Sequence, residues 1–451
     1  MTIAALRPDG FDPPADGRRQ TALRAVVRRH RLHVFVASSR FDSLYILNLQ
    51  FSICTMRFML DLISRTASAA LARWASAFPV LALAGPRQSG KTTLARLTFP
   101  DKPYLSLEDL DTRERALADP RSFLAGLPAG AVLDEVQRAP DLLSYLQGVV
   151  DARGRMGEFV VTGSQQFGLR DHVSQSLAGR AAYLQLLPLS WAEITAVRAP
   201  GQATPALEEA LWRGGYPALF DVRRSAAESP SAWFAAYVAT YVERDVRQVL
   251  RIADLTLFRR FVLMCAARTA QLLNLNALAA DCGISQPTAR AWLEVLQASY
   301  LVRLLPPFHR NFGKRLVKTP KLYFLDTGLL CHLLRIDSPR TLATHAMRGP
   351  VFESWVVAET LKYRWHRGLE ADLYFWRDNH GTEVDLVYEH QGLLHGVEIK
   401  SGATFGADWL RPGERWRGYA GPDAAPLTLM YGGDTSYAVG ETRVMSWKSL
   451  G

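Results

Sequence analysis

The chain has 451 residues, of which 48% are hydrophobic and 21% are charged, which is the composition of a folded protein with several domains. The net charge of +10 is compatible with binding a polyanion such as DNA, but many basic proteins bind none. The four cysteines lie far apart without C-x-x-C spacing, which argues against a zinc site and against a disulfide framework. No apolar run is long enough to span a membrane, so a cytoplasmic protein without membrane contact is expected.

Residues 1–55 differ from the rest of the chain. Pro and Gly cluster early, and neither a helical nor a strand period persists. Eight Arg against four Asp leave this segment with a charge of +4. It is either a basic arm for nucleic acid or a leader upstream of a true start at Met56 or Met59. The second interpretation is favoured, so an unstructured or wrongly assigned leader is expected.

The strongest signal follows a helical pattern that ends at Pro79. An apolar run leads into the loop sequence Gly85-Pro86-Arg87-Gln88-Ser89-Gly90-Lys91-Thr92-Thr93 and then into a second helical pattern. This is the G-x-x-x-x-G-K-T motif of a phosphate-binding loop, between the strand and the helix that the motif requires. We expect these residues to bind ATP, with Lys91 at the β- and γ-phosphates and the Thr92 hydroxyl on Mg²⁺.

Two further strands are expected to end at the same edge of the sheet. Residues 131–135 form an apolar run that ends in Asp134 and Glu135. In a nucleotide-binding fold, Asp134 is expected to hold Mg²⁺ directly or through water, and Glu135 to polarise the attacking water. After the next apolar run comes Thr162-Gly163-Ser164, where Ser164 either senses the γ-phosphate or only forms a local turn.

These motifs carry a resemblance. G-P-R-Q-S-G-K-T-T-L-A, L-D-E-V-Q-R-A-P-D-L-L, V-T-G-S-Q, S-L-A-G-R and L-P-L-S follow one another in the order found in uncharacterised bacterial AAA-type ATPases with a C-terminal domain of unknown function. The chain resembles that family from about Met56 to its end. The resemblance implies an ATPase core with the roles given above. It also makes Arg180 either a γ-phosphate contact across a subunit boundary, and hence implies a homo-oligomer, or an ordinary salt-bridging arginine.

A second module is expected after a helical region at residues 201–257. Within residues 258–348, two helices at 275–280 and 286–298 precede two apolar strands at 300–305 and 321–325, which a basic loop at 310–315 joins. This order predicts a winged helix. Gln286, Thr288 and Arg290 are residue types that read bases, although winged helices also bind proteins or serve as ATPase lids.

The last module, residues 349–451, contains a helix with Glu353 and then three strands. The second strand carries Asp385, and the third ends in Glu398 and Lys400, which share a face because side chains alternate along a strand. This arrangement resembles nucleases of the P-D-(D/E)-x-K type, with Asp385, Glu398 and Glu353 as Mg²⁺ ligands and Lys400 as a catalytic group. The alternative is a solvated strand face, or a nuclease fold that survives only as a remnant.

The sequence therefore predicts an α/β protein with an AAA-type ATPase core at residues 56–200, a helical region, a winged helix and a nuclease-like α/β domain. The expected activity is Mg²⁺-dependent ATP hydrolysis on or near DNA. The alternatives are an ATP-switched regulator that binds DNA or protein and has an inert nuclease-like domain, and a scaffold in which the nucleotide is structural.

Overall fold

The computed structural model describes residues 63–164, 173, 176–197, 203–221, 229–242, 254–308 and 318–450, and the backbone of residues 24–28 and 31–35. The chain divides into two units, Met1–Leu62 and Ile63–Gly451. In the first unit, β1 (Arg24–Arg28) and β2 (Arg31–Phe35) form an antiparallel pair. These ten residues are therefore extended, whereas an unstructured or wrongly assigned leader was expected. Each strand contains valine, which favours extended backbone.

The second unit begins with a five-stranded sheet in the order β4-β5-β6-β3-β7, in which all neighbours are parallel. Its strands are β3 (Val80–Ala84), β4 (Tyr104–Ser106), β5 (Ala131–Asp134), β6 (Phe159–Gly163) and β7 (Ala181–Gln185). The residues of β3, β5 and β6 are all buried, which explains their continuous apolar sequences. Because the strands are parallel, the residues that follow β3, β5 and β6 meet at one edge of the sheet.

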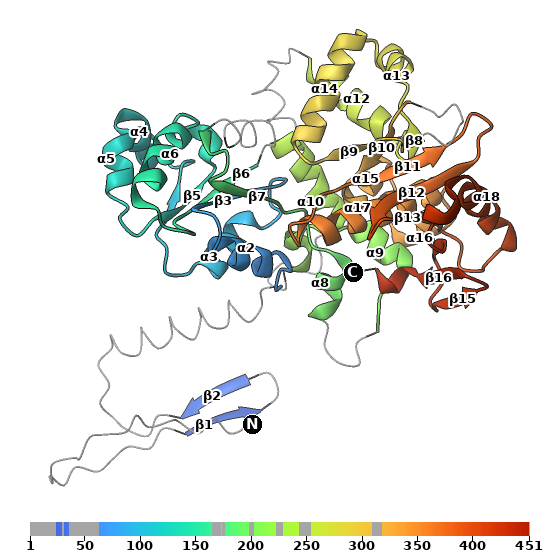
Figure 1. Ribbon diagram of the computed structural model, residues 1–451, viewed down its shortest axis with the longest axis horizontal. Helices are drawn as coiled ribbons and strands as arrows, with labels where there is room; N and C mark the ends of the chain where they lie inside the picture. Colours follow the sequence, from blue (N-terminus) through green and yellow to red (C-terminus); the bar gives the residue numbers. More distant parts are fainter. Residues whose placement is uncertain are drawn as a thin grey trace. The chain divides into compact units, whose positions relative to one another are not determined.

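Helices cover both faces of this sheet (Figure 1). Leu81 and Leu83 of β3 pack with α2 and α3, whereas Ala82 of the same strand belongs to the core that contains Leu146 of α6. The helical elements of this domain are α2 (Ala67–Ala75), α3 (Lys91–Thr98), α4 (Leu110–Ala118), α5 (Pro120–Ala125), η1 (Val136–Arg138), α6 (Leu142–Arg153) and α8 (Trp191–Ala196). The predicted α/β class with a parallel sheet is confirmed.

The middle of the chain is mainly helical. Its helical elements are α9 (Leu207–Arg213), η2 (Pro217–Phe220), α10 (Pro230–Tyr237), η3 (Val238–Val242), α12 (Leu255–Ala266), α13 (Leu275–Cys282), α14 (Gln286–Ala298), α15 (Thr327–Leu333) and α16 (Pro339–Thr344). An antiparallel sheet in the order β8-β10-β9 joins β8 (Gln271–Leu272), β9 (Val302–Leu305) and β10 (Lys321–Phe324). The basic loop expected at residues 310–315 lies outside the described residues.

The last domain packs α17 (Arg348–Trp365) and α18 (Arg411–Ala420) against a six-stranded sheet in the order β11-β12-β13-β14-β16-β15. Strands β11 to β13 are antiparallel, and β14 and β16 continue parallel to β13. The remaining elements are β11 (Tyr374–Arg377), β12 (Glu383–His390), β13 (Leu393–Lys400), η4 (Ala407–Leu410), η5 (Gly421–Asp423), β14 (Thr428–Tyr431), β15 (Tyr437–Val439), β16 (Thr442–Ser446) and η6 (Trp447–Ser449).

Both faces of β13 are covered. Val397 and Ile399 belong to the core that contains α17. On the same strand, Gly396 lies against Trp416 of α18 so closely that an added Cβ would stand 2.6 Å from the indole ring. Val397, Glu398 and Ile399, which alternate between the two faces of β13, are therefore all buried.

In the described part of the chain, no helix is long and apolar enough to cross a membrane. Cys265, Cys282 and Cys331 are free and buried. Burial raises the pKa of the Cys265 and Cys331 thiols, so both are protonated at neutral pH.

Candidate functional site

The predicted phosphate-binding loop connects the carboxyl end of β3 to the first turn of α3. A Cβ at Gly85 would lie 2.1 Å from the Leu186 carbonyl oxygen, so only glycine fits there. Gly90 caps α3 in the left-handed conformation with φ 94°, which glycine adopts without strain. The predicted binding residues 85–93 all lie in this loop or in the helix turn after it.

Lys91 is buried and points back across the loop. Its Nζ donates to the carbonyl oxygens of Gly85 and Pro86, each at 2.9 Å. Within the same loop, the hydroxyl of Ser89 is buried and has no hydrogen-bond partner among the described residues. A buried ammonium group and an unpartnered buried hydroxyl fit a loop that receives a polar anionic ligand.

Asp134 is the last residue of β5 and is 6% exposed. Thr92 Oγ1 lies 3.0 Å from each of its carboxylate oxygens. The Tyr104 hydroxyl donates to the same carboxylate at 2.7 Å, and Thr162 also donates to it. Burial and the neighbouring carboxylate raise the pKa of Tyr104, so this phenol remains a donor. A hydroxyl beside a carboxylate fits a Mg²⁺ ion that binds protein oxygens and keeps several waters.

Glu135 adopts the left-handed backbone conformation with φ 57°, which is uncommon for a residue with a side chain. Ser164 Oγ donates to Glu135 Oε2 at 3.0 Å, and Gln137 Nε2 donates to the same oxygen and, at 3.1 Å, to Ser164 Oγ. Ser164 therefore lies at the sheet edge where it was predicted, and it holds Glu135. Sequence reasoning placed Thr162 at this sheet edge without giving it a role, and it missed Gln137, a polar residue two positions after Glu135.

Arg180 lies immediately before β7, at the sheet edge opposite the phosphate-binding loop. Ala181 pairs with Val80 at the start of β3, and the loop begins after Ala84 at the other end, about 16 Å away along the strand. The Arg180 guanidinium makes two hydrogen bonds to Asp151 of α6, with Nε 2.5 Å from Oδ1 and Nη2 2.8 Å from Oδ2. Arg180 thus forms a surface salt bridge and is too far away to reach the loop of its own chain.

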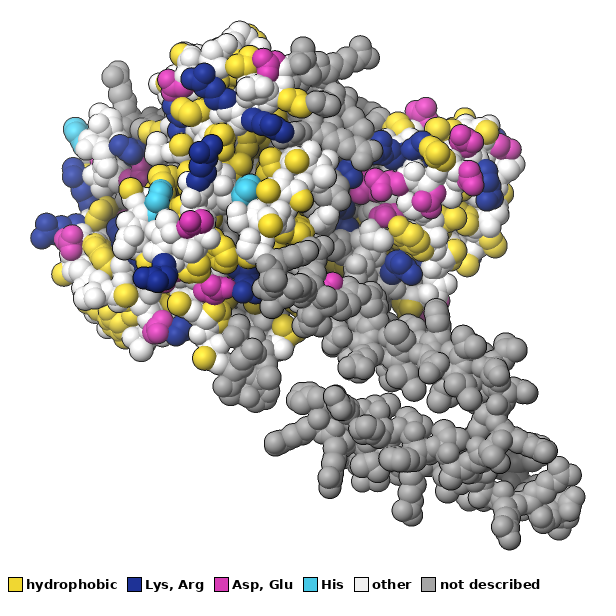
Figure 2. Space-filling view, turned by 180° about the vertical axis from the view of Figure 1, so that it is seen from behind, with side chains coloured by type: hydrophobic (Ala, Val, Ile, Leu, Met, Phe, Trp, Pro, Cys, Tyr) yellow, Lys and Arg dark blue, Asp and Glu magenta, His cyan; other side chains and the backbone are white. Residues whose placement is uncertain are grey.

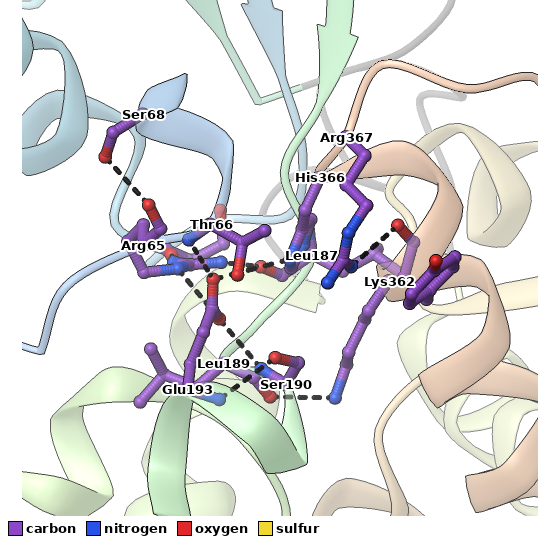
Figure 3. A network of polar contacts seen from close by, with 12 residues as sticks. Arg65, Thr66, Ser68, Leu187, Leu189, Ser190, Glu193, Lys362, His366 and Arg367 are labelled. Carbon is purple, nitrogen blue, oxygen red and sulfur yellow. Dashed lines mark hydrogen bonds and ion pairs between the residues drawn. The ribbon is translucent and has the colours of Figure 1, made fainter. Parts of the chain in front are cut away.

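A buried arginine outside the predicted set, Arg65, contacts the phosphate-binding loop. Figure 3 shows Arg65 beside Leu187 and Glu193. Arg65 precedes α2, and its Nη1 donates to the carbonyl oxygen of Ser89 at 2.7 Å. Its Nη2 donates to the carbonyl oxygen of Leu187 at 2.7 Å, and its Nε to Glu193 Oε2 at 3.1 Å. One guanidinium therefore ties the loop to the segment between β7 and α8.

The same network continues into α17. Burial lowers the pKa of His366 to about 4, so the ring is neutral at pH 7. Its Nε2 accepts from the Leu187 amide at 3.1 Å, which assigns the ring proton to Nδ1, 3.6 Å from Glu193 Oε1. Burial alone raises the pKa of Glu193, but the neighbouring His366 and the Arg65 charge outweigh it and hold that pKa below its usual range. The loop and the C-terminal domain thus share one buried polar network (Figure 3).

Lys362, one turn before His366, adds a further contact. Its Nζ donates to the Leu189 carbonyl oxygen at 2.9 Å (Figure 3). The same Nζ donates to Glu359 Oε1 at 2.8 Å. At the start of α8, Ser190 and Glu193 form a capping box, for which the Ser190-Trp191-Ala192-Glu193 sequence is a local signal. That signal indicates where α8 begins, but it does not indicate that Glu193 contacts Arg65 and His366.

In the C-terminal domain, three of the four predicted residues lie together on β12 and β13. Lys400 Nζ lies 3.1 Å from Glu398 Oε2 and 3.5 Å from Asp385 Oδ2, and the Ile399 amide donates to the same Asp385 oxygen at 2.9 Å. Glu353 of α17 joins them through Lys321, which bridges Glu353 and Asp385. Sequence reasoning missed Lys321, because it lies in the preceding domain.

This cluster is not a solvated strand face. Glu398 is 1% exposed and Asp385 is 7% exposed, because helices cover both sides of β13. Burial, and then the Asp385 charge, raise the pKa of Glu398, and the same two causes raise that of Glu353. No group of three Asp, Glu, His or Cys side chains in the described residues is arranged to hold a metal ion. The predicted Mg²⁺ ligands are thus close together but do not fit a metal as they stand.

Three family models match consecutive parts of this chain. Residues 77–195 match an AAA domain, residues 204–340 a domain of unknown function (DUF8612) and residues 348–450 another (DUF4143). A solved structure, the Walker-type ATPase paby2304 of Pyrococcus abyssi, has 15% identity and a TM-score of 0.41, covering 60% of this chain and 96% of that one.

Two relatives are closer in sequence. The uncharacterised proteins Mb2031c of Mycobacterium bovis and Rv2008c of Mycobacterium tuberculosis are each 36% identical over 343 residues, covering 75% of this chain and 74% of the relative. The chain belongs to the same family as these two mycobacterial proteins, and it carries an AAA-type P-loop ATPase domain ahead of two domains of unknown function.

Proposed function

We propose that the AAA domain hydrolyses ATP with Mg²⁺ as its cofactor. The observation that carries this proposal is the meeting of Thr92, Asp134 and Glu135 at one edge of the sheet. The Thr92 hydroxyl lies 3.0 Å from both Asp134 oxygens, and Glu135 follows directly with its carboxylate held by Ser164. A metal-binding hydroxyl and carboxylate beside a water-orienting carboxylate are the groups that nucleotide hydrolysis needs.

Each side chain has a separate task. Lys91 and the loop amides bind the phosphates, and Thr92 and Asp134 hold Mg²⁺, which neutralises phosphate charge when bound. Glu135 accepts a hydrogen bond from a water molecule and aims it at the γ-phosphate. Ser164 keeps the Glu135 carboxylate in place and so takes part through Glu135.

Lys91→Ala tests the binding step. We expect nucleotide affinity to fall by about 10- to 100-fold, because a charged hydrogen bond to phosphate contributes about 1.5–3 kcal/mol. Titration with a fluorescent ATP analogue measures this. Lys448→Ala is the matched control, because Lys448 pairs with Asp434 at the surface of the C-terminal domain. A Lys91→Ala protein that binds and turns over ATP like the parent would contradict the ATPase assignment.

We also propose that Arg180 acts on the nucleotide of a neighbouring subunit. Its place at the sheet edge opposite its own loop supports a contact in trans over one in cis. A guanidinium near the γ-phosphate stabilises charge in the transition state. A homo-oligomer is therefore part of the proposal.

Arg180→Ala is expected to slow ATP turnover by about 10- to 100-fold while ATP binding stays near that of the parent, because the lost charge acts mainly in the transition state. Asp151→Ala is the control, since it breaks the same salt bridge and keeps the arginine. Mixing Arg180→Ala with Lys91→Ala subunits should restore part of the turnover. A strictly monomeric protein with full activity rules the proposal out.

A second candidate function is action on DNA. The order α13, α14, β9 and β10 along the chain, with β9 and β10 antiparallel, supports a winged helix, and Gln286 and Arg290 of α14 are exposed. Figure 2 shows Lys and Arg side chains on the visible face of the molecule, among Asp, Glu and hydrophobic ones. Exposed basic side chains of this kind can contact DNA phosphates.

The C-terminal cluster separates two versions of this candidate. In one, Asp385, Glu398 and Lys400 belong to a metal-dependent nuclease that ATP hydrolysis gates. In the other, the chain is an ATP-switched regulator and this domain is inert. ATP turnover with and without DNA, beside a nicking assay in Mg²⁺ or Mn²⁺, distinguishes them: nicking supports the nuclease, and DNA-stimulated turnover without nicking supports the regulator.

A further inference from the structure

Lys321 of β10 reaches out of its own domain into the acidic cluster of the next. Its Nζ lies 3.0 Å from Glu353 Oε1 and 3.8 Å from Asp385 Oδ1, and it forms an ion pair with Glu383. The residue is 3% exposed. Three carboxylates, one from α17 and two from β12, thus surround a single buried ammonium group.

The fold holds this ammonium group in place. Lys321 pairs with Leu305 of β9 and with Leu272 of β8, so the strand that carries it is fixed on both sides. Tyr323, two residues further along β10, donates its hydroxyl to the same Glu353 oxygen at 2.6 Å. The ammonium group also lies 5.6 Å from the centre of the Phe375 ring. Strand β10 therefore delivers two donors to one carboxylate, and its position is set by the sheet.

The charges around the cluster show what Lys321 does. Lys400 neutralises the side of the cluster formed by Glu398 and one oxygen of Asp385, and Arg377 pairs with Glu383 at 2.9 Å. Without Lys321, the carboxylates of Glu353, Glu383 and Asp385 would face one another with too little positive charge in a buried place. A cation at this point is required, and a lysine supplies it.

One oxygen in the cluster has no partner. Glu398 Oε1 is buried and makes no hydrogen bond within the described residues, although Oε2 of the same carboxylate pairs with Lys400. A buried carboxylate oxygen left unpaired is costly, and such oxygens are ligands for hard divalent cations. With Lys321 in place, however, the acidic side chains do not form a metal-binding group.

We propose that the Lys321 ammonium group is the resident cation of this cluster, and that a divalent cation binds there only when that group is removed. Removal requires either substitution of Lys321 or displacement of β10. In its present arrangement the cluster joins the β8-β10-β9 sheet to the C-terminal domain by charge. The proposal concerns cation binding alone and does not depend on ATP hydrolysis or on DNA cleavage.

The test measures Mn²⁺ binding to the full chain without nucleotide. The electron paramagnetic resonance signal of free Mn²⁺ reports how much of the ion remains unbound. Lys321→Met is expected to gain a site that binds Mn²⁺ at least about tenfold more tightly than any Asp385-dependent site of the parent, because three carboxylates lose their cation. Lys321→Met combined with Asp385→Asn is expected to lose the gained site. This double variant separates the cluster from Thr92 and Asp134, which are unchanged in it.

Lys362→Met is the matched control. Lys362 is a similarly buried lysine, but among the described residues only the Glu359 carboxylate lies within 4 Å of its Nζ. A single carboxylate is too few for a divalent cation, so this variant is expected to gain no Mn²⁺ site.

Two results would overturn the proposal: a folded Lys321→Met protein that gains no site, or a parent protein whose Mn²⁺ binding disappears in Asp385→Asn. If Lys321→Met does not fold, the proposal is tested on the parent protein, by comparing its melting temperature with and without Mn²⁺. An Asp385-dependent rise in melting temperature with Mn²⁺ contradicts a resident lysine, and the absence of that rise supports it. Recovery of Lys321→Gln melting by Mn²⁺ supports it as well.

Discussion

Glu135→Gln is expected to bind ATP with the affinity of the parent and to hydrolyse it about 10²- to 10⁴-fold more slowly, the usual contribution of a positioned acid–base group. Glutamine has nearly the same shape, so it can still accept hydrogen bonds from Ser164 and Gln137 through its amide oxygen. It lacks the negative charge that polarises water. Single-turnover hydrolysis of ATP, measured beside equilibrium binding, separates the two effects.

The control for this variant is Glu114→Gln, the same substitution at an exposed position of α4 in the same domain. It should leave both binding and hydrolysis unchanged. Equal hydrolysis rates for Glu135→Gln and Glu114→Gln would remove Glu135 from the mechanism. A joint loss of binding and hydrolysis would instead assign Glu135 to holding the nucleotide. The left-handed backbone of Glu135, with φ 57°, favours the role of polarising the attacking water, because such strain is often found at reacting groups.

Arg65→Met is expected to destabilise the protein by about 3–5 kcal/mol, the usual cost of removing one partner from a buried ion pair. The side chains of Arg65 and Glu193 are 7% and 2% exposed, so water screens this pair very little. Methionine fills similar space but leaves the Glu193 carboxylate without its cation, and the carbonyl oxygens of Ser89 and Leu187 without a donor. The midpoint of urea unfolding measures the loss.

Two further variants make this result specific. Arg73→Met removes an exposed arginine of α2 and should change stability by less than about 0.5 kcal/mol. Arg65→Lys keeps the charge but lacks the planar fork, so its stability should lie between those of the parent and Arg65→Met. Equal midpoints for Arg65→Met and Arg73→Met would show that the network in Figure 3 contributes nothing to stability.

Because Arg65 binds a carbonyl of the phosphate-binding loop, its loss has a second effect. ATP affinity should fall in Arg65→Met even under conditions where the protein is fully folded, since Ser89 loses the contact that fixes its backbone. The fraction folded, followed by circular dichroism in the binding buffer, separates this effect from global unfolding.

Much of the ATPase site was predictable because it is local. The phosphate-binding loop is a run of consecutive residues whose amides face one ligand, so its sequence carries the whole geometry. Asp134 and Ser164 were predictable because the ends of parallel strands meet at one edge of the sheet. The period of two along β13 predicts that Glu398 and Lys400 share a face, and in the structure their side chains lie 3.1 Å apart.

Only the tertiary structure decided the contacts between distant residues. Arg65 and Glu193 are separated by 128 positions, and no pattern in either segment indicates the other. Glu398 is 1% exposed although it lies on the polar face of β13, which the alternation of polar and apolar residues does not predict. Lys321 reads in the sequence as the first residue of an ordinary strand, yet it becomes the cation of another domain's carboxylates. Local patterns determine which backbone forms and which face is polar, but the partner of a buried charge depends on how whole layers pack together.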